Sequence, residues 1–338
     1  MAISNDLLSS TLFSIRDGEV DELFQKVAFL DNCKKFGGIE YEDGGIKIQR
    51  PLSIAEHSSI TNLPTGYEAV NLAVKDVLQP AIYNWADFTA PIVVTKKEEL
   101  ENKGEKAIVK IVEARMRSVM GMLRRELNKQ ILAGSSTILN TVNTLNGAIS
   151  TGFLEAEPKA NQNNVVGGIS KATYNVNGWT NQVYDVGAAF GTSGVLGMQQ
   201  LAIQANTVTH MGEIKTVLMS EAGMANYRRS LFAQERFINE KTLDGGRMQL
   251  AFGGAVVEQD LDMGFLYNSA AYGNAPLTAY FLNFDGIKMV FHKEADFAVS
   301  AFEHVSGTTA RAAQLYVKMQ LIADHLGSCG ILFDGDTY

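Results

Sequence analysis

One long run with helical periodicity, residues 96–134, constrains the fold more than any other part of the chain. Acidic residues gather at its start and basic residues at its end, which complements the helix dipole, and Gly134 follows as a stop signal. Gly104 costs about 1 kcal/mol relative to Ala in a helix, so we expect the continuous helix to begin near it. The pattern keeps no strict seven-residue repeat, so we expect a helix lying on a sheet and not a coiled coil. The apolar positions at helical spacing are Leu100, Ile108, Ile111, Val112, Val119, Leu123, Leu127 and Ile131.

Composition limits the classes of protein to consider. The chain has 338 residues, enough for one large or two ordinary domains, and a hydrophobic fraction of 46%, enough for a real core. Its net charge of −8 disfavours binding to nucleic-acid phosphates. Cys33 and Cys329 lie too far apart in sequence to suggest a disulfide framework, which favours a reducing cytosol. The sequence shows neither a signal peptide nor an apolar run of transmembrane length.

Residues 1–35 are predicted to form an arm with a short amphipathic helix over 19–30. Its stripe of Leu23, Val27 and Leu30 must dock on something, because so short a helix is not stable alone. The docking surface is either the same subunit or a neighbour.

Residues 36–80 are predicted to form a long two-stranded excursion. Apolar residues alternate with polar ones from Ile46 to Ile54, and Pro51 marks an edge strand. A second alternating run, Val70–Val74, is taken as the returning strand. Because no helix is available to cover this hairpin, we expect it to be covered by another chain. Residues 81–95 then lead into the long helix as a further strand.

After Gly134 the chain is rich in Gly, Asn, Ser and Thr. The later elements that we expect are a helix over 191–204, a strand over 214–219, a helix capped by Ser220, a strand pair or bulged strand over 250–257, a hairpin turning at Asp285-Gly286, and a strand over 315–321.

The search for chemistry finds no catalytic, cofactor-binding or metal-binding residues. The five histidines lack ligand spacing, no phosphate-binding loop is present, and the glycines at 191, 194 and 197 favour helix packing or a flexible loop. Cys329 is interpreted as a small core residue, and the carboxylates Glu155 and Glu157 as solvent-exposed. This result favours a structural protein. A cluster of Arg228, Arg229 and Arg236 fits either carboxylates of a neighbouring subunit or plain solvation.

Five phrases, taken in order, resemble the major capsid proteins of tailed bacteriophages, which have the Hong Kong 97-type fold. They are GYEAVNLAVKDVLQPAIYNWADFTAPIVVTKKEEL at 66–100, VVGGISKATYNVNGW at 165–179, QERFINE at 234–240, LAFGGAVVEQD at 250–260 and FLNFDGIKMVFH at 281–292. The resemblance implies an α+β fold with five parts. These are an N-terminal arm (1–35), an E-loop (36–80) that lies over a neighbouring subunit, a peripheral or P domain with a spine helix (81–137), an axial or A domain (138–286), and a return to the P domain (287–338).

The resemblance further implies a major capsid protein that assembles through hexamers and pentamers into an icosahedral shell around double-stranded DNA, without sequence-specific binding. It implies a portal, a decoration or cement protein and, because residues 1–35 leave no room for a scaffolding domain, a separate scaffolding protein. The expected location is the virion, assembled in the host cytoplasm, with no membrane contact. The subunit-interface candidates are Arg50, Glu56, Tyr67, Arg228, Arg229 and Arg236. The alternatives are an encapsulin-like compartment and a soluble enzyme with an unrecognised site.

Overall fold

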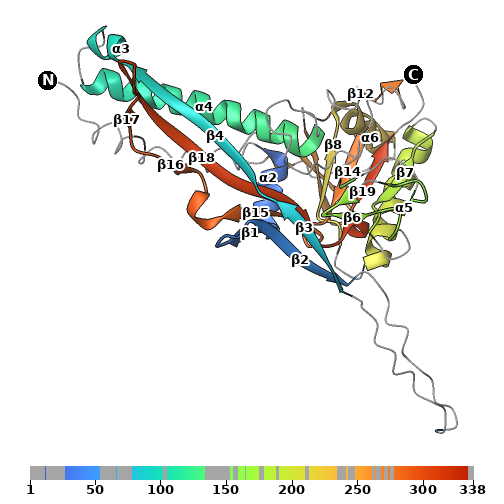
Figure 1. Cartoon of the computed structure of the whole chain (residues 1–338). Helices are drawn as coiled ribbons and strands as arrows, with labels where there is room; N and C mark the ends of the chain where they lie inside the picture. The colour runs from blue at the N-terminus through green and yellow to red at the C-terminus, as the bar shows by residue number, and fades with distance from the viewer. Residues whose placement is uncertain are drawn as a thin grey trace.

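The chain combines long and short strands with a few helices, and its longest helix runs beside its longest strand (Figure 1). The computed structural model describes residues 12, 27–53, 66, 78–101, 105–133, 153–154, 159–163, 165–174, 179–187, 190–209, 213–233, 241–242, 248–260, 263, 268–269, 273–274 and 278–333.

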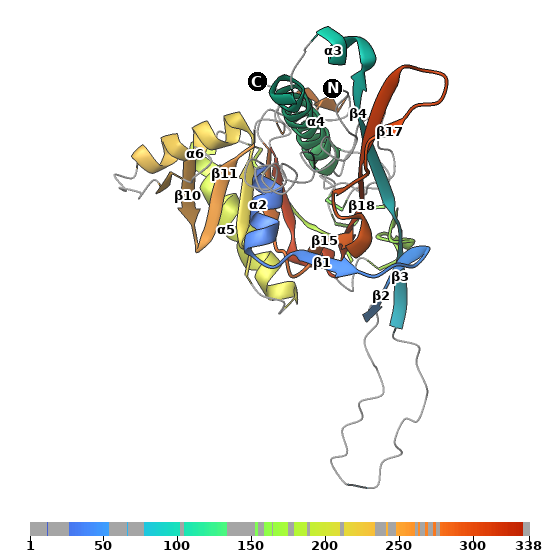
Figure 2. The same ribbon diagram turned by 90° about the vertical axis from the view of Figure 1, so that its left-hand side faces the viewer.

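The long helical run forms two helices, α3 (Lys96–Glu101) and α4 (Glu105–Ala133). The continuous helix therefore begins directly after Gly104, as predicted. On the inner side of α4, Val112, Met116 and Ile131 are fully buried, whereas the Met122 side chain is 72% exposed. Helix α4 lies on β4 (Ala86–Thr95) and runs along β18 (Ala310–Ala323), which confirms the prediction of a helix on a sheet (Figures 1 and 2).

Strand β18 organises a six-stranded sheet. It pairs with β4 along one side and with β15, β16 and β17 along the other, and β1 joins the far side of β15 in parallel. Phe88 and Ile92 of β4 are buried while Asp87 and Thr89 are exposed, the period of two expected for a strand with one covered face. The other strands are β1 (Ile39–Glu42), β15 (Ile287–His292), β16 (Ala298–Val299) and β17 (Glu303–His304).

A seven-stranded sheet forms the second part of the molecule, with strand order β7-β19-β14-β8-β11-β10-β9. Alternate residues of its central strands enter different cores: Leu218 and Tyr280 join the core shared with α4, and Val217 and Phe281 join the core of α5 and α6. A sheet covered on both faces explains why all of β8 is buried and why its last three residues, 217–219, are consecutive apolar residues. The elements are β7 (Gln182–Asp185), β8 (Thr216–Met219), β9 (Lys241–Thr242), β10 (Met248–Phe252), β11 (Ala255–Gln259), β14 (Thr278–Leu282), β19 (Gly330–Phe333), α5 (Phe190–Thr209) and α6 (Glu221–Ala233).

Several local predictions for this part are confirmed. Ser220 caps α6, because its Oγ accepts the backbone N–H of Gly223 at 3.2 Å. Strands β10 and β11 form an antiparallel pair joined at Gly253-Gly254, both with positive φ. Helix α5 contains the predicted 191–204 segment, and a Cβ at Gly197 would lie 2.4 Å from the Tyr184 ring, so this glycine serves helix packing.

The predicted hairpin at Asp285-Gly286 is wrong. Strand β14 pairs with β8 and β19, whereas β15 pairs with β1 and β18, so the turn passes the chain from one sheet to the other. Gly286 has no positive φ. A Cβ there would lie 2.0 Å from Ser328 Oγ and 2.6 Å from the His325 carbonyl oxygen, so the glycine is required for close packing and not for a type I′ turn.

The structure describes only residues 27–30 of the predicted arm helix over 19–30: Val27 is an N-cap residue, and residues 28–30 are the start of α2 (Ala28–Lys35). Residues 13–26, with Leu23, lie outside the described residues. Val27, Phe29 and Leu30 are buried in the core that contains α4, and the Phe29 and Phe284 rings meet edge to face at 5.7 Å. The described helix therefore docks on its own subunit.

The remaining elements are short. They are the strand pairs β5 (Val165–Val166) with β6 (Ile169–Ser170) and β12 (Asn268–Ser269) with β13 (Gly273–Asn274), and the 3₁₀-helices η3 (Lys293–Ala295) and η4 (Leu326–Ser328). Among the described residues, no helix combines the length and the apolar character that a membrane span requires.

Candidate functional site: the hairpin anchor

Strands β2 (Lys47–Ser53) and β3 (Leu78–Asn84) form an antiparallel hairpin stem that leaves the body of the subunit (Figures 1 and 2). The partner of β2 is therefore 78–84 and not the predicted run at 70–74, which lies outside the described residues. Ile48, Leu52, Ala81 and Tyr83 are buried, so the stem is covered by its own chain, contrary to the expectation of cover from another chain.

The opposite side of the stem is open. Leu78 is 62% and Ile82 39% exposed, and the prolines at 51 and 80, which face each other across the strands, are also exposed. Ile46, which the alternating pattern placed with Ile48, is 93% exposed instead. It precedes β2, after the positive-φ residues Gly44 and Gly45, and so falls outside the strand period.

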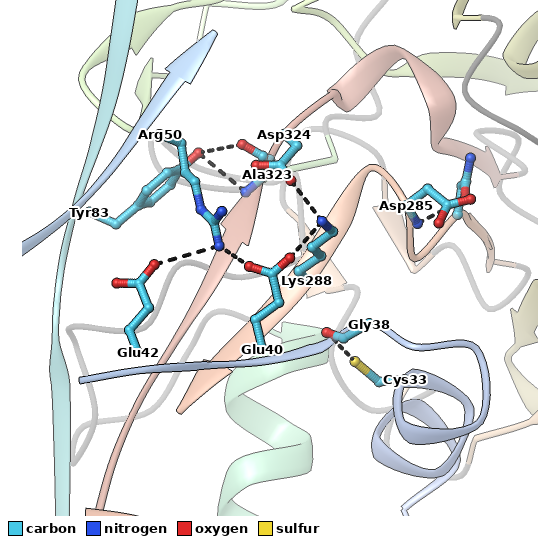
Figure 3. Close-up of polar contacts among 11 residues, drawn as sticks. Cys33, Gly38, Glu40, Glu42, Arg50, Tyr83, Asp285, Lys288, Ala323 and Asp324 are labelled. Carbon is cyan, nitrogen blue, oxygen red and sulfur yellow. Dashed lines mark hydrogen bonds and ion pairs between the residues drawn. The ribbon is translucent and has the colours of Figure 1, made fainter. Parts of the chain in front are cut away.

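Tyr83 ties the stem to the long strand β18. Its hydroxyl donates to the carbonyl oxygen of Ala323 at 3.1 Å and accepts the Ala323 N–H at 3.2 Å (Figure 3). Burial raises the pKa of Tyr83 well above its usual range, so the hydroxyl stays protonated. Beside it, the Ile82 N–H donates to the carbonyl oxygen of Gly167 at 2.8 Å, which brings the β5–β6 turn against the stem.

A group of charged side chains, here named the anchor network, joins the stem to β1, β15 and the end of β18 (Figure 3). Arg50 of β2 forms an ion pair with Glu40 of β1 and lies 3.6 Å from a Glu42 carboxylate oxygen. Lys288 of β15 bridges Glu40 at 2.7 Å and Asp324 at 3.2 Å. The anchor network consists of Glu40, Glu42, Arg50, Lys288 and Asp324.

The pKa values in the anchor network follow from this arrangement. Partial burial alone would raise the pKa of Glu40, but the hydrogen bonds from Lys288 and Arg50 outweigh it, so the pKa lies below its ordinary value of 4.5. Burial would lower the pKa of Lys288, but the bonds to Glu40 and Asp324 raise it above 10.5. Glu40 and Lys288 are therefore both charged near neutral pH.

The structure places only some of the predicted interface candidates. Arg50 lies in the anchor network with its side chain 23% exposed. On α6, Arg228 is half-buried and Arg229 exposed. Glu56, Tyr67 and Arg236 lie outside the described residues, so the Arg228–Arg229–Arg236 cluster stays a prediction.

Sequence reasoning missed Glu40, Glu42, Lys288 and Asp324. The alternation Ile39-Glu-Tyr-Glu next to the turn at Gly44-Gly45 was the one local signal for Glu40. Lys288 gives no such signal, because its partner is 248 positions away in sequence.

The described residues hold no group of three or more metal-ligating side chains. Both cysteines are buried, which raises the pKa of Cys33 to about 12 and that of Cys329 to about 11. A thiol with such a pKa is a poor nucleophile. Cys329 directly precedes β19 in the core, which confirms its interpretation as a small core residue.

Comparison with solved structures identifies the architecture. The capsid asymmetric unit of cyanophage A-1(L) superposes with a TM-score of 0.61 at 16% sequence identity, covering 87% of this chain and 88% of the phage chain. The capsid of an empty GTA particle matches with a TM-score of 0.53 at 11% identity, covering 90% and 96% of the two chains. The chain has the fold of a phage major capsid protein.

A related architecture also matches. The SrpI encapsulin of Synechococcus elongatus PCC 7942 superposes with a TM-score of 0.52 at 9% identity, covering 89% of this chain and 86% of the encapsulin. No family model and no curated protein matches the sequence. These matches confirm two predictions from the sequence: the mixed helix and sheet class, and the capsid fold that the sequence resemblance implied.

Proposed function

We propose that this protein is the major capsid protein of a tailed bacteriophage, which assembles through hexamers and pentamers into an icosahedral shell enclosing double-stranded DNA. One observation carries the proposal: the capsid fold extends over nearly the whole chain, with 87% of it matched to the cyanophage capsid subunit. In this reading the protein has a structural role and not a catalytic one.

The parts of the fold support an assignment of roles. Residues 36–80, which include β2, the start of β3 and the segment 54–77 between them, act as the E-loop and lie over a neighbouring subunit. Helix α4 acts as the spine of the P domain (81–137, with 287–338), and residues 138–286 form the A domain around the capsomer axis. The exposed apolar side chains Leu78 and Ile82 support this use of the stem, because they offer area to a neighbouring chain.

The anchor network sets the direction in which the stem leaves the subunit. Its charges connect β2 to β1 directly and to β15 through Glu40 and Lys288, and Tyr83 adds two hydrogen bonds to β18. A stem fixed at its base and open on one side suits a segment that must reach a neighbour at nearly the same angle in hexamers and pentamers. Among the predicted interface residues, Arg50 would then act by orienting the stem, while Glu56 and Tyr67 would contact the neighbour.

Other partners follow from the capsid role. The chain needs a separate scaffolding protein and a portal to form closed heads, and a decoration or cement protein is a further expected partner. The net charge of −8 suits a shell wall that encloses DNA without binding tightly to its phosphates. Assembly would take place in the host cytoplasm and the product would be the virion.

The test is expression of the full chain, alone and together with its neighbouring genes, followed by light scattering and negative-stain electron microscopy. We expect megadalton particles with icosahedral outlines when the chain is expressed together with its neighbouring genes. Deletion of 55–68 should leave a folded subunit that forms no closed shells. In a control variant, a glycine–serine segment of equal length replaces the same residues. The control distinguishes an effect of the missing side chains from an effect of the shorter loop. Normal shells from both variants would show that the E-loop assignment is wrong.

The encapsulin match gives a second candidate, a protein compartment that holds cargo. The contents of purified particles separate the two functions. Nuclease-protected double-stranded DNA supports the capsid, whereas an enclosed enzyme without DNA supports the compartment. A small soluble oligomer in light scattering would contradict both.

A further inference from the structure

Strand β4 has one free side. It pairs with β18 over all ten of its residues, and no other described strand pairs with it. A long strand with an unpaired side is a template for pairing with another chain, and natural proteins block such edges. The backbone groups on the free side of β4 therefore need a partner or a block.

The register shows which backbone groups point to the free side. Gln314 of β18 lies opposite Pro91 and directs its own backbone groups the other way, since its carbonyl oxygen accepts the Ser300 N–H at 2.9 Å and its N–H donates to Ser300 Oγ at 2.8 Å. In an antiparallel pair these directions alternate. Every second residue of β4, beginning at Asp87 and ending at Thr95, thus directs its N–H and C=O to the free side.

Three consecutive outward positions are blocked. The Thr95 N–H donates to Glu98 Oε2 at 3.0 Å. The Val93 carbonyl oxygen accepts a hydrogen bond from Arg115 Nη1, and Arg115 Nη2 forms an ion pair with Glu98 Oε1. At Pro91 the N–H is missing altogether. The two charged side chains, Glu98 from α3 and Arg115 from α4, form what we name the edge cap.

The local sequence explains how the edge cap forms. Thr95 and Glu98 make a capping box at the start of α3, in which the N3 carboxylate bonds the N-cap backbone N–H. Oxygen Oε1 of the same carboxylate then receives the guanidinium of Arg115. The guanidinium of an arginine holds its N–H donors in a rigid planar fork, so that here Nη2 bonds the carboxylate while Nη1 bonds the carbonyl oxygen.

A second copy of this chain is the partner that the open edge would admit. An antiparallel edge is complementary to itself under a two-fold rotation. Val93 and Tyr316, exposed at 38% and 37% on the outer face beside the edge, would add apolar contacts to such a pair. The backbone groups of Asp87 and Thr89 also point to the free side. In a pair centred at Thr89, Val93 of one copy would lie opposite residue 85 of the other, so Arg115 on the Val93 carbonyl oxygen lies in the path of the second strand.

We propose that the edge cap of Glu98 and Arg115 closes β4 against strand pairing with β4 of a second copy, so that subunits meet only through their other surfaces. This inference concerns the free subunit and does not depend on what the assembled particle contains.

The test traps the forbidden pair with a cysteine at Thr89, whose backbone groups lie on the free side. In a β4–β4 pair centred there, the two Cα atoms would be about 5.5 Å apart, which a disulfide spans. The full-length variants are Thr89→Cys alone, with Arg115→Ala, and with Arg125→Ala. Arg125 is the matched control, an exposed arginine on the same helix. Native Cys33 and Cys329 are buried and add little background.

After mild oxidation, we expect disulfide-linked dimer to rise about tenfold with Arg115→Ala and to stay unchanged with Arg125→Ala, a factor that corresponds to about 1.4 kcal/mol. Equal dimer in all three variants would overturn the proposal, and so would an equal rise with Arg125→Ala. Circular dichroism checks folding. If Arg115→Ala does not fold, Arg115→Met decides by the same criteria, because methionine keeps an unbranched side chain but has no N–H that can donate to the Val93 carbonyl oxygen.

Discussion

Tyr83 and Ala323 exchange two hydrogen bonds across the junction between the hairpin stem and the long strand, at 3.1 and 3.2 Å. The two residues are 240 positions apart in sequence, and both are buried. One hydroxyl thereby satisfies the last backbone N–H and C=O of β18 at the point where the stem meets both the six-stranded sheet and the anchor network (Figure 3).

Tyr83→Phe should lower the free energy of unfolding by about 1–3 kcal/mol, because it leaves a buried N–H and a buried carbonyl oxygen without a partner. Urea denaturation measures the change. Tyr316→Phe is the matched control: it removes an exposed hydroxyl that donates to Asp87 at 2.7 Å, and we expect a loss within about 0.5 kcal/mol. Equal losses in the two variants would show that the Tyr83 hydroxyl has no special role.

The ion pair between Lys288 and Glu40 should show measurable coupling. A double-mutant cycle with Glu40→Gln and Lys288→Met should give a coupling energy of about 1 kcal/mol, the upper end for pairs that are not fully buried. The pair Asp43–Lys293 is the control, with side chains 78% and 53% exposed and an N–O distance of 2.5 Å. Its cycle should give a value near zero. A larger coupling for the exposed pair would contradict the importance of the anchor network.

The anchor network also predicts how stability depends on pH. Because the pKa of Glu40 is lowered in the folded chain, its contribution is present above the ordinary value of 4.5 and is lost as the pH falls through the lowered value. The pKa of Lys288 is raised, so its contribution is present below 10.5 and is lost as the pH rises through the raised value. As the pH falls from 7 to 3, the free energy of unfolding should decrease less steeply for Glu40→Gln than for the unchanged chain. If the free energy of unfolding decreased equally steeply in both proteins, Glu40 would not be a source of the loss of stability in acid.

Elements whose pattern is set locally could be predicted from the sequence. The amphipathic period of α4, the Ser220 cap of α6 and the apolar run of β8 each follow from residues within the element. The prediction at Asp285-Gly286 failed because turn chemistry is local while strand pairing is not. The same dipeptide suits a hairpin, but here Gly286 packs against Ser328, 42 positions later in the chain, and the two flanking strands join different sheets.

The candidate site was predictable only in outline. The alternating run beginning at Ile46 identified the first strand of the stem, and Arg50 was selected within it. Its partners belong to β1 and β15, and only the fold brings Glu40 and Lys288 together. The second strand was placed too early, at 70–74, because Pro80 lies inside the true strand and weakens its alternating pattern.

Two adjacent residues of α4 allow a direct test of which face of the helix is buried. Leu123 packs against the core, whereas the Met122 side chain is 72% exposed. Leu123→Asp should destabilise the chain by about 3 kcal/mol or more, because it places an unpaired charge against apolar side chains. Met122→Asp puts the same charge one position earlier and should change the free energy of unfolding by less than about 0.5 kcal/mol. Solubility, followed by urea denaturation of the soluble fraction, distinguishes the variants. A soluble, assembled Leu123→Asp chain would mean that the spine helix is held by its other face, and with it the packing of α4 on β4 would be wrong.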